Sequence, residues 1–96
     1  MTILVRYFPA NLTTEQYDEV LRRLGEAGIF PDAAMDLHIS YGEEGSLRVS
    51  EIWDSPQDMQ AFGEKLMPIL ADAGVEMAAE PEVIEIRNHV RRASAG

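Results

Sequence analysis

The chain has 96 residues, of which 46% are hydrophobic, and it contains no cysteine. This size predicts a single domain with one core, and the lack of cysteine excludes disulfides, thiolate nucleophiles and cysteine-based zinc or iron–sulfur sites. With 17 acidic and 8 basic residues the formal net charge is −9, which repels nucleic acid phosphates and anionic lipid headgroups.

The first strand and the first helix are predicted within the N-terminal third of the chain. Thr2–Phe8 is rich in β-branched and aromatic residues, and Pro9 is expected to end this strand. Both faces of the strand are largely apolar, as expected for a strand at the centre of a sheet. A helix should follow, because Thr13 and Gln16 have the spacing of a capping box, and Gly28 is a natural stop for it.

Two further strands are predicted in the middle of the chain. Asp36–Tyr41 alternates between apolar and polar residues, and Ser46–Asp54 returns after a hairpin loop at 42–45. The alternation in the second of these strands breaks near Glu51 and Ile52. This break predicts a β-bulge at that point.

A second helix is predicted from Ser55, a capping residue that is followed by a proline. Gly74 should end it, and Pro68 should kink or restart it, because proline cannot continue the usual helical hydrogen bonds. Residues 75–80, which precede Pro81, are expected to be irregular and to form a lid or a dimer arm.

The last strand is predicted at Val83–Val90, so that residues 1–90 form the domain and 91–96 a flexible tail. The N-terminus lacks the basic leader and the cleavage site of a signal peptide, and no apolar run is long enough to cross a bilayer. A cytoplasmic protein is therefore expected.

The order strand–helix–strand–strand–helix–strand predicts an α+β, ferredoxin-like domain. Its four-stranded antiparallel sheet should have the first and third strands at its centre and both helices on one face. The face against the helices is expected to use Leu37, Ile39, Leu47, Ile84 and Ile86. The opposite face is expected to carry His38, Ser40, Arg48, Ser50, Glu85, Arg87 and His89 among apolar neighbours. A second copy of the chain should cover this opposite face, giving a homodimer.

The segment Leu47–Ser55, with Phe62 and Leu66 after it, resembles the dimeric α+β-barrel superfamily that includes the antibiotic-biosynthesis monooxygenase-like domains. In that superfamily a strand commonly ends in a tryptophan, here Trp53, and a serine or threonine then caps a helix that carries an aromatic residue. The resemblance extends from Ile3 to about Val90 and implies a dimeric α+β barrel. Members include cofactor-free oxygenases, heme-degrading enzymes, isomerases and many proteins without a known role.

No cofactor is expected for this chain. Heme-degrading members use an asparagine, a tryptophan and a histidine on a helix. Trp53 matches the tryptophan, but Asn11 matches the asparagine poorly and the second predicted helix contains no histidine. The two histidines, His38 and His89, also lack the spacing of metal ligands.

His38 and His89 are the candidate general bases, since histidine is the side chain that titrates near neutral pH. The alternative for either one is a histidine on the surface or at an interface, on an edge strand. Arg6 is the third catalytic candidate, because its guanidinium could orient an anionic or quinone oxygen. The alternative for Arg6 is an ion pair with Glu51 or Glu85 on a neighbouring strand.

Trp53 either stacks on a planar ligand or anchors the core. The tyrosines Tyr7, Tyr17 and Tyr41 are expected to be packing residues. The residues proposed to bind a ligand are Arg6, His38, Ser40, Arg48, Trp53 and Arg87.

Two functions follow from these residues and from the resemblance. The first is a dimer that binds a planar, apolar, polyketide-like molecule and acts as a cofactor-independent monooxygenase, or as an isomerase or cyclase. The second is a non-catalytic ligand-binding, accessory or purely structural dimer. An enzyme requires a titratable group beside a cavity, whereas a filled interior would contradict every ligand-binding hypothesis.

Overall fold

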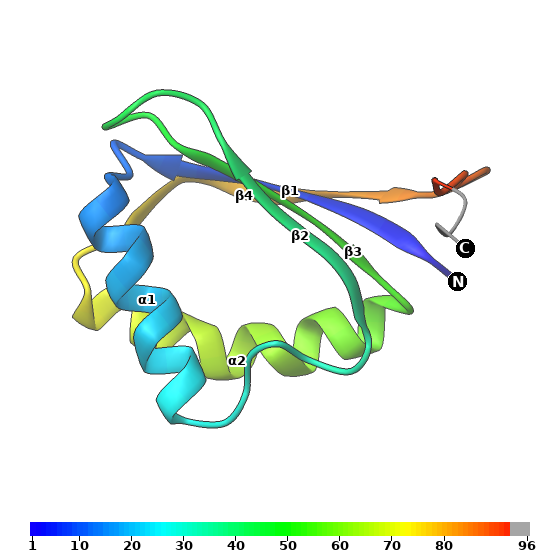
Figure 1. Ribbon diagram of the computed structural model, residues 1–96, viewed down its shortest axis with the longest axis horizontal. Helices are drawn as coiled ribbons and strands as arrows, with labels where there is room; N and C mark the ends of the chain where they lie inside the picture. The colour runs from blue at the N-terminus through cyan, green and yellow to red at the C-terminus, as the bar shows by residue number, and fades with distance from the viewer. Residues whose placement is uncertain (93–96) are drawn as a thin grey trace.

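The computed structural model describes residues 1–92 and has the predicted α+β architecture, with both helices on one face of a four-stranded sheet (Figure 1). The sheet is antiparallel, with the strand order β2-β3-β1-β4, so the first and third strands are central as predicted. The elements are β1 (Ile3–Ala10), α1 (Thr14–Glu26), β2 (Met35–Tyr41), β3 (Arg48–Trp53), α2 (Pro56–Asp72) and β4 (Glu76–Glu85). The ferredoxin-like order is confirmed.

Both ends of α1 form as the sequence predicts. The Thr13 hydroxyl accepts a hydrogen bond from the Gln16 amide at 3.1 Å, and the Gln16 side chain accepts one from the Thr13 amide at 3.1 Å. This reciprocal capping box satisfies two amides that would otherwise have no partner in the helix. At the other end Gly28 has a φ of 72° and so provides the left-handed residue that closes many helices.

The predicted restart of the second helix at Pro68 is wrong, because α2 runs from Pro56 to Asp72 as one helix. Ser55 caps its start by accepting a hydrogen bond from the Asp58 amide. Pro68 removes only the one hydrogen bond that its own nitrogen would donate to the carbonyl of Glu64. The packing of the apolar face, with Phe62 buried, holds the helix together across that gap.

The last strand lies earlier in the chain than predicted. β4 occupies Glu76–Glu85 instead of Val83–Val90, so residues 76–80 are a strand and not an irregular arm. It pairs with β1, which continues through Pro9 to Ala10, and their register shifts twice between Arg6 and Pro9. Pro81 is tolerated because β4 is an edge strand with an irregular ladder at this point.

The bulge predicted in β3 is located instead in β2. β3 pairs with β1 without a register shift, whereas Met35 and Leu37 of β2 face the consecutive residues Trp53 and Ile52. Asp36 is therefore the extra residue. The alternation of β3 is unbroken, and Glu51 lies on the same face as Trp53.

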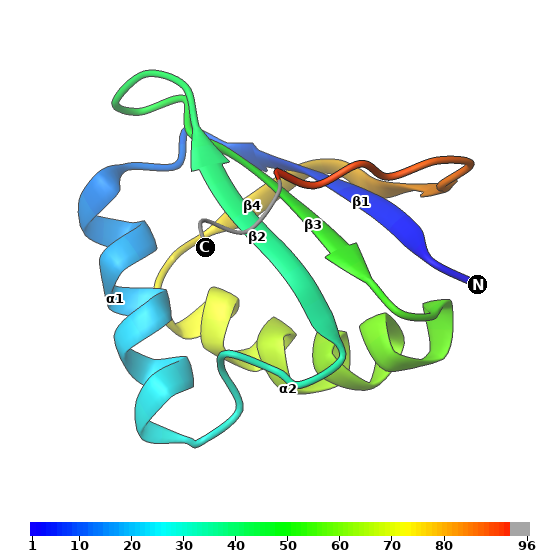
Figure 2. The same ribbon diagram turned by 45° about the vertical axis from the view of Figure 1, so that its right-hand side comes forward.

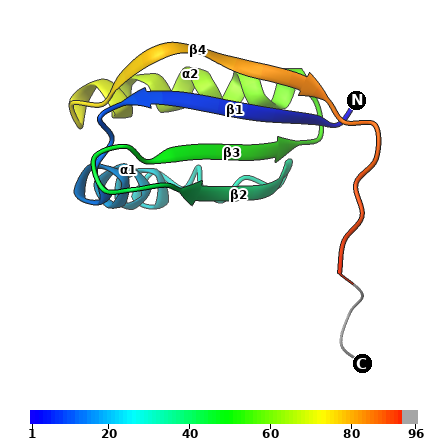
Figure 3. The same cartoon turned by 90° about the horizontal axis from the view of Figure 1, so that it is seen from above.

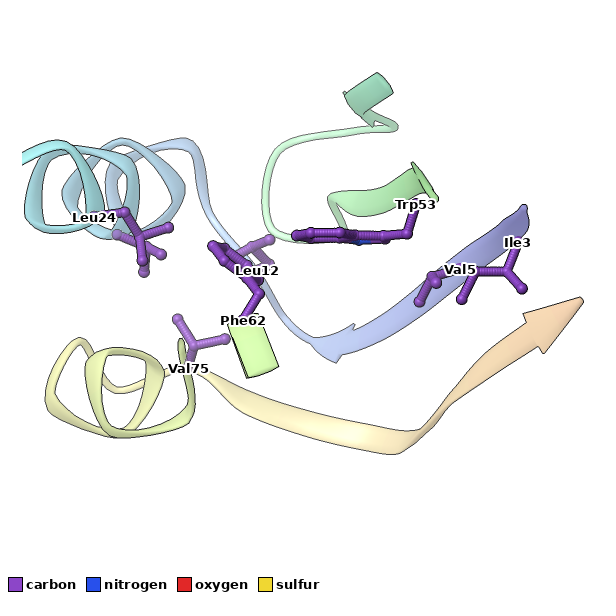
Figure 4. Close-up of a cluster of buried hydrophobic side chains, with 8 residues drawn as sticks. Ile3, Val5, Leu12, Leu24, Trp53, Phe62 and Val75 are labelled. Atoms are coloured by element: carbon purple, nitrogen blue, oxygen red, sulfur yellow. The ribbon is translucent and has the colours of Figure 1, made fainter. Parts of the chain in front are cut away.

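The core fills the space between the sheet and the helices (Figure 4). Trp53, Ile3 and Val5 are the largest fully buried side chains, and the Trp53 ring packs against Phe62 of α2 with 5.2 Å between ring centres. Seen from above, α2 lies beneath β4 and β1, and α1 lies beneath β3 and β2 (Figure 3).

The predicted faces of β2 are reversed in the structure. Leu37 and Ile39 lie on the helix-free face and are exposed, while His38 points to the helices and bonds with Tyr17 of α1. Ile84 is likewise exposed, opposite Leu4. Alternation along a strand tells which residues share a face but not which face meets the helices, so the apolar set was assigned to the wrong side.

After β4 the chain crosses the end of the sheet towards the start of β2 (Figure 3). Arg91 forms an ion pair with Asp36 there, and His89 Nδ1 lies 3.8 Å from the same carboxylate. Residues 93–96 of the predicted tail lie outside the described residues. Within residues 1–92 no helix has the length and apolar character needed to span a membrane.

Candidate functional site

A cavity of about 70 Å³ lies between the sheet and the two helices. Its wall is almost entirely apolar, with leucine, valine and phenylalanine side chains from both helices and from the segment before β2. Four polar side chains also reach it, namely Tyr7, Tyr17, His38 and Glu51. Few polar groups converging in an apolar cavity are typical of a site that orients a small molecule.

Three of these groups form a continuous chain of hydrogen bonds. The Tyr17 hydroxyl lies 2.7 Å from His38 Nε2, and His38 Nδ1 lies 2.6 Å from Glu51 Oε2. These hydrogen bonds join α1 to the neighbouring strands β2 and β3, whose arrangement Figure 2 shows. A histidine held between a carboxylate and a hydroxyl has the geometry of an activated general base.

Glu51 is the most buried of the three groups in this chain of hydrogen bonds. It is only 3% exposed, and its second oxygen accepts a hydrogen bond of 2.9 Å from the Trp53 indole nitrogen. The Tyr7 hydroxyl lies near it, and the charge of Glu51 raises the pKa of this hydroxyl. A buried carboxylate without partners is costly, and the two donors from His38 and Trp53 supply partners for both of its oxygens.

The hydrogen bonds set the tautomer of His38. An ionised carboxylate only accepts hydrogen bonds, so Nδ1 of His38 carries the proton and donates it to Glu51. Nε2 is then the unprotonated nitrogen, and it accepts a hydrogen bond from the Tyr17 hydroxyl. The imidazole is also packed edge-on against Phe30, with 5.2 Å between ring centres, so its orientation is fixed.

The Tyr7 hydroxyl is held in its neutral form. Burial raises the pKa of this hydroxyl far above the ordinary value, and the neighbouring charge of Glu51 raises it further. Both effects disfavour the phenolate, because a second negative charge would be placed beside a carboxylate in an apolar space. Tyr7 therefore presents a protonated hydroxyl to the cavity at neutral pH.

Two of the three arginines predicted to bind a ligand, Arg6 and Arg48, lie on the helix-free face and do not reach the cavity. Arg6 pairs with Glu82 at 3.0 Å, so its partner is neither Glu51 nor Glu85 as the alternative prediction had it. Arg48 donates to the carbonyl of Pro9 at 2.8 Å.

The other predicted residues divide between the core and the surface. Trp53 is completely buried in the core, where its nitrogen binds Glu51. Ser40 is exposed on edge strand β2, paired with Val49 and so not on the predicted helix-free face. Arg87 and His89 are exposed beyond the end of β4. Of the predicted candidates, the structure places only His38 on the cavity wall.

Glu51 and Tyr17 are site residues that the sequence pattern did not predict. Unbroken alternation from Val49 through Glu51 to Trp53 is the signal that would have found the first, because it places a carboxylate on the core side next to a tryptophan. The helical spacing of α1 places Tyr17 on the same face as Val20 and Leu24. This spacing gives the direction of the Tyr17 side chain but does not identify its hydrogen-bond partner. Among residues 1–92 no three histidine, aspartate or glutamate side chains gather closely enough to hold a metal ion.

Comparison with known proteins identifies the fold. No family model and no curated protein matches the chain. Among solved structures it is similar to a candidate antibiotic biosynthesis monooxygenase from Chloroflexus aurantiacus J-10-fl, with a TM-score of 0.61 and 15% identity over 94% of this chain and 98% of that one. A second such candidate, from Deinococcus radiodurans, has a TM-score of 0.59 and 15% identity over 98% of this chain and 100% of that one. The predicted resemblance in fold is confirmed.

Proposed function

We propose that this protein binds a planar, apolar molecule with an acidic hydroxyl or enol group, and that His38 takes up its proton in a cofactor-independent oxygenation. The observation that carries the proposal is the Tyr17–His38–Glu51 chain on the wall of an apolar cavity. The names of the two similar structures, both candidate monooxygenases, support oxygen as the second substrate.

The proton moves along the hydrogen bonds already described. The Tyr17 oxygen accepts the substrate proton while the Tyr17 proton passes to His38 Nε2, and Glu51 stabilises the resulting imidazolium. The apolar wall keeps the substrate anion poorly solvated and therefore strongly reducing.

The substrate supplies the electrons for the rest of the reaction. Its carbanion adds to molecular oxygen to form a carbon–oxygen bond, and His38 returns the proton to the resulting peroxide. Loss of the remaining carbon-bound hydrogen as a proton, with cleavage of the oxygen–oxygen bond, gives a ketone and water. The methylene carbon thus loses four electrons as it becomes a carbonyl, and these four electrons fully reduce both oxygen atoms of O₂.

Anthrone is a suitable probe, because it is planar, tricyclic and enolisable at a methylene group. We expect the protein to accelerate oxygen uptake by anthrone, with one O₂ consumed and one anthraquinone formed per anthrone. An oxygen electrode and mass spectrometry measure both quantities. Binding of anthrone without accelerated uptake would contradict the enzymatic proposal and favour a ligand-binding protein, and absence of binding would contradict both.

The proposal includes a homodimer formed through the helix-free face of the sheet. Four large apolar side chains on that face, Leu37, Ile39, Tyr41 and Ile84, are between 40% and 44% exposed. A contiguous apolar surface of this kind on a small domain favours coverage by a partner. A second copy of the chain covers the same surface by two-fold symmetry, as the resemblance to the dimeric superfamily implies.

Ile39→Lys is expected to dissociate this dimer, because it places an ammonium group in the middle of the apolar surface. Light scattering should give about twice 10.7 kDa for the wild type and 10.7 kDa for the variant. The substitution reduces the net charge of −9, so stronger repulsion between chains cannot explain dissociation. Val90→Lys, at a residue 84% exposed, is the matched control and should stay dimeric. A monomeric wild type would disprove the dimer.

A further inference from the structure

We propose that the groove between α2 and β4 binds the apolar body of the substrate, while only its acidic end enters the inner cavity. The inference rests on the proposed function and specifies the substrate class. The substrate is an elongated molecule with one acidic end and an uncharged apolar remainder.

The outer groove has a volume of about 450 Å³ and is lined by α2 and by β4 around Pro81. This is within the range of roughly 300–1,000 Å³ that holds drug-sized molecules. Three methionines, Met59, Met67 and Met77, contribute to its wall. Methionine side chains are flexible and polarisable, so they adapt to an aromatic or alkyl surface.

The groove and the inner cavity are adjacent. Tyr7, Leu66, Leu70 and Met77 line both spaces, so these side chains form the partition between them. Tyr7 lines the inner cavity together with Glu51 and also lines the groove on the outer side. A molecule in the groove is therefore separated from the acid–base chain only by side chains.

The inner cavity is too small to hold the whole substrate. Its volume is about 70 Å³, whereas an engineered cavity of about 150 Å³ is the size that holds one benzene ring. A planar polycyclic substrate does not fit inside. Its hydroxyl or enol edge does fit, and the remaining rings then have to lie in the outer groove.

The charges of the groove indicate what the remainder of the substrate carries. Among the residues that the structure describes, Glu80 is the one charged residue in its lining, and it is exposed. Together with a net charge of −9, this carboxylate disfavours a carboxylate or phosphate on the substrate body. A neutral aromatic or alkyl body is the chemistry that fits.

Gly63 keeps the groove open from the α2 side. A Cβ atom added at Gly63 would meet no atom within 4 Å, although the residue lies in the groove wall. A larger side chain at this position would thus project into the groove without displacing the protein. Gly25 in α1 is the matched control, because a Cβ there also meets nothing within 4 Å and it lies in neither lining.

Equilibrium binding of anthrone to Gly63→Leu and Gly25→Leu tests the inference. We expect Gly63→Leu to weaken anthrone binding at least tenfold and to retain the wild-type circular dichroism. Gly25→Leu should change the affinity for anthrone less than threefold. Equal anthrone affinity in the two variants would contradict binding of the substrate body in the groove, even if the wild type oxidises anthrone. Loss of anthrone affinity in Gly63→Leu alone would support binding of the substrate body in the groove, even if no oxygen is consumed.

A second variant tests the charge argument without touching the helix interior. We expect the wild type to bind anthrone at least tenfold more tightly than an anthrone that carries a carboxylate on an outer ring, and Glu80→Lys to reduce that ratio at least threefold. Glu43→Lys, in the exposed loop after β2, makes the same change of charge away from the groove and should leave the ratio unchanged. An equal effect of both substitutions would contradict the position of the substrate body beside Glu80.

Discussion

Replacing His38 with glutamine is expected to slow the oxidation of anthrone by a factor of roughly 100 or more. Glutamine has an amide N–H that can donate to Glu51 and an amide oxygen that can accept from Tyr17, so the shape of the site is kept. It has no basic nitrogen, however, and cannot store the proton that the substrate releases. Rates of oxygen uptake at saturating anthrone measure the loss, and quenching of Trp53 fluorescence measures affinity.

The matched control is His89→Gln, the same substitution at the other histidine. His89 is exposed and contacts Asp36 beyond the end of the sheet, so we expect its rate to stay within a factor of two of the wild type. Affinity for anthrone should change less than threefold in both variants. A His38→Gln protein with the wild-type rate would show that the base is elsewhere, and an equal loss in both variants would point to an indirect effect.

Replacing Trp53 with alanine is expected to lower the free energy of unfolding by about 3–5 kcal/mol. The indole is fully buried, packs against Phe62 and donates to Glu51. Its removal leaves a cavity and deprives a buried carboxylate of one donor. A small domain has a total stability of roughly 5–15 kcal/mol, so a large share would be lost. Urea denaturation followed by circular dichroism is the measurement, because Trp53 is the only tryptophan.

Trp53→Phe separates packing from hydrogen bonding in this result. Phenylalanine keeps an aromatic ring against Phe62 but has no donor for Glu51. We expect its unfolding midpoint to lie between those of the wild type and Trp53→Ala. Equal midpoints for all three proteins would mean that the indole contributes neither packing nor a hydrogen bond to the stability of the core.

The order of the helices and strands follows from local patterns that are visible in the sequence. The capping box of Thr13, the Ser55–Pro56 start of α2 and the glycines that follow both helices fixed the element order. That order in turn predicts the sheet, because right-handed crossovers leave only this arrangement of four strands. These signals act within a few residues, so tertiary contacts did not override them.

The position of the site was harder to predict, because it depends on which face of each strand meets the helices. Leu37 and Ile39 look like core residues, yet the polar His38 between them faces inward. An inward histidine is stable only because Glu51 on β3 and Tyr17 on α1 provide partners for both ring nitrogens. Partners that lie 13 and 21 positions apart in the chain leave no signature in a local pattern.

The last strand was misplaced for a related reason. Pro81 and the small residues Ala78 and Ala79 indicate a loop when they are taken alone. Pairing with β1 extends the strand through them, and the register shifts opposite Phe8 and Pro9 absorb the irregularity. Such compensation between strands is visible only in the assembled sheet.

The outer edge of β4 has a consequence for how copies of this chain meet. Four exposed glutamates, Glu76, Glu80, Glu82 and Glu85, lie along a strand that also contains a proline and an uneven ladder. A second sheet adding there would bring the same four carboxylates of each copy together and would find no amide at Pro81. The chain is thereby protected on this side from open-ended strand-to-strand polymerisation, and growth into fibrils through β4 is disfavoured even at high concentration.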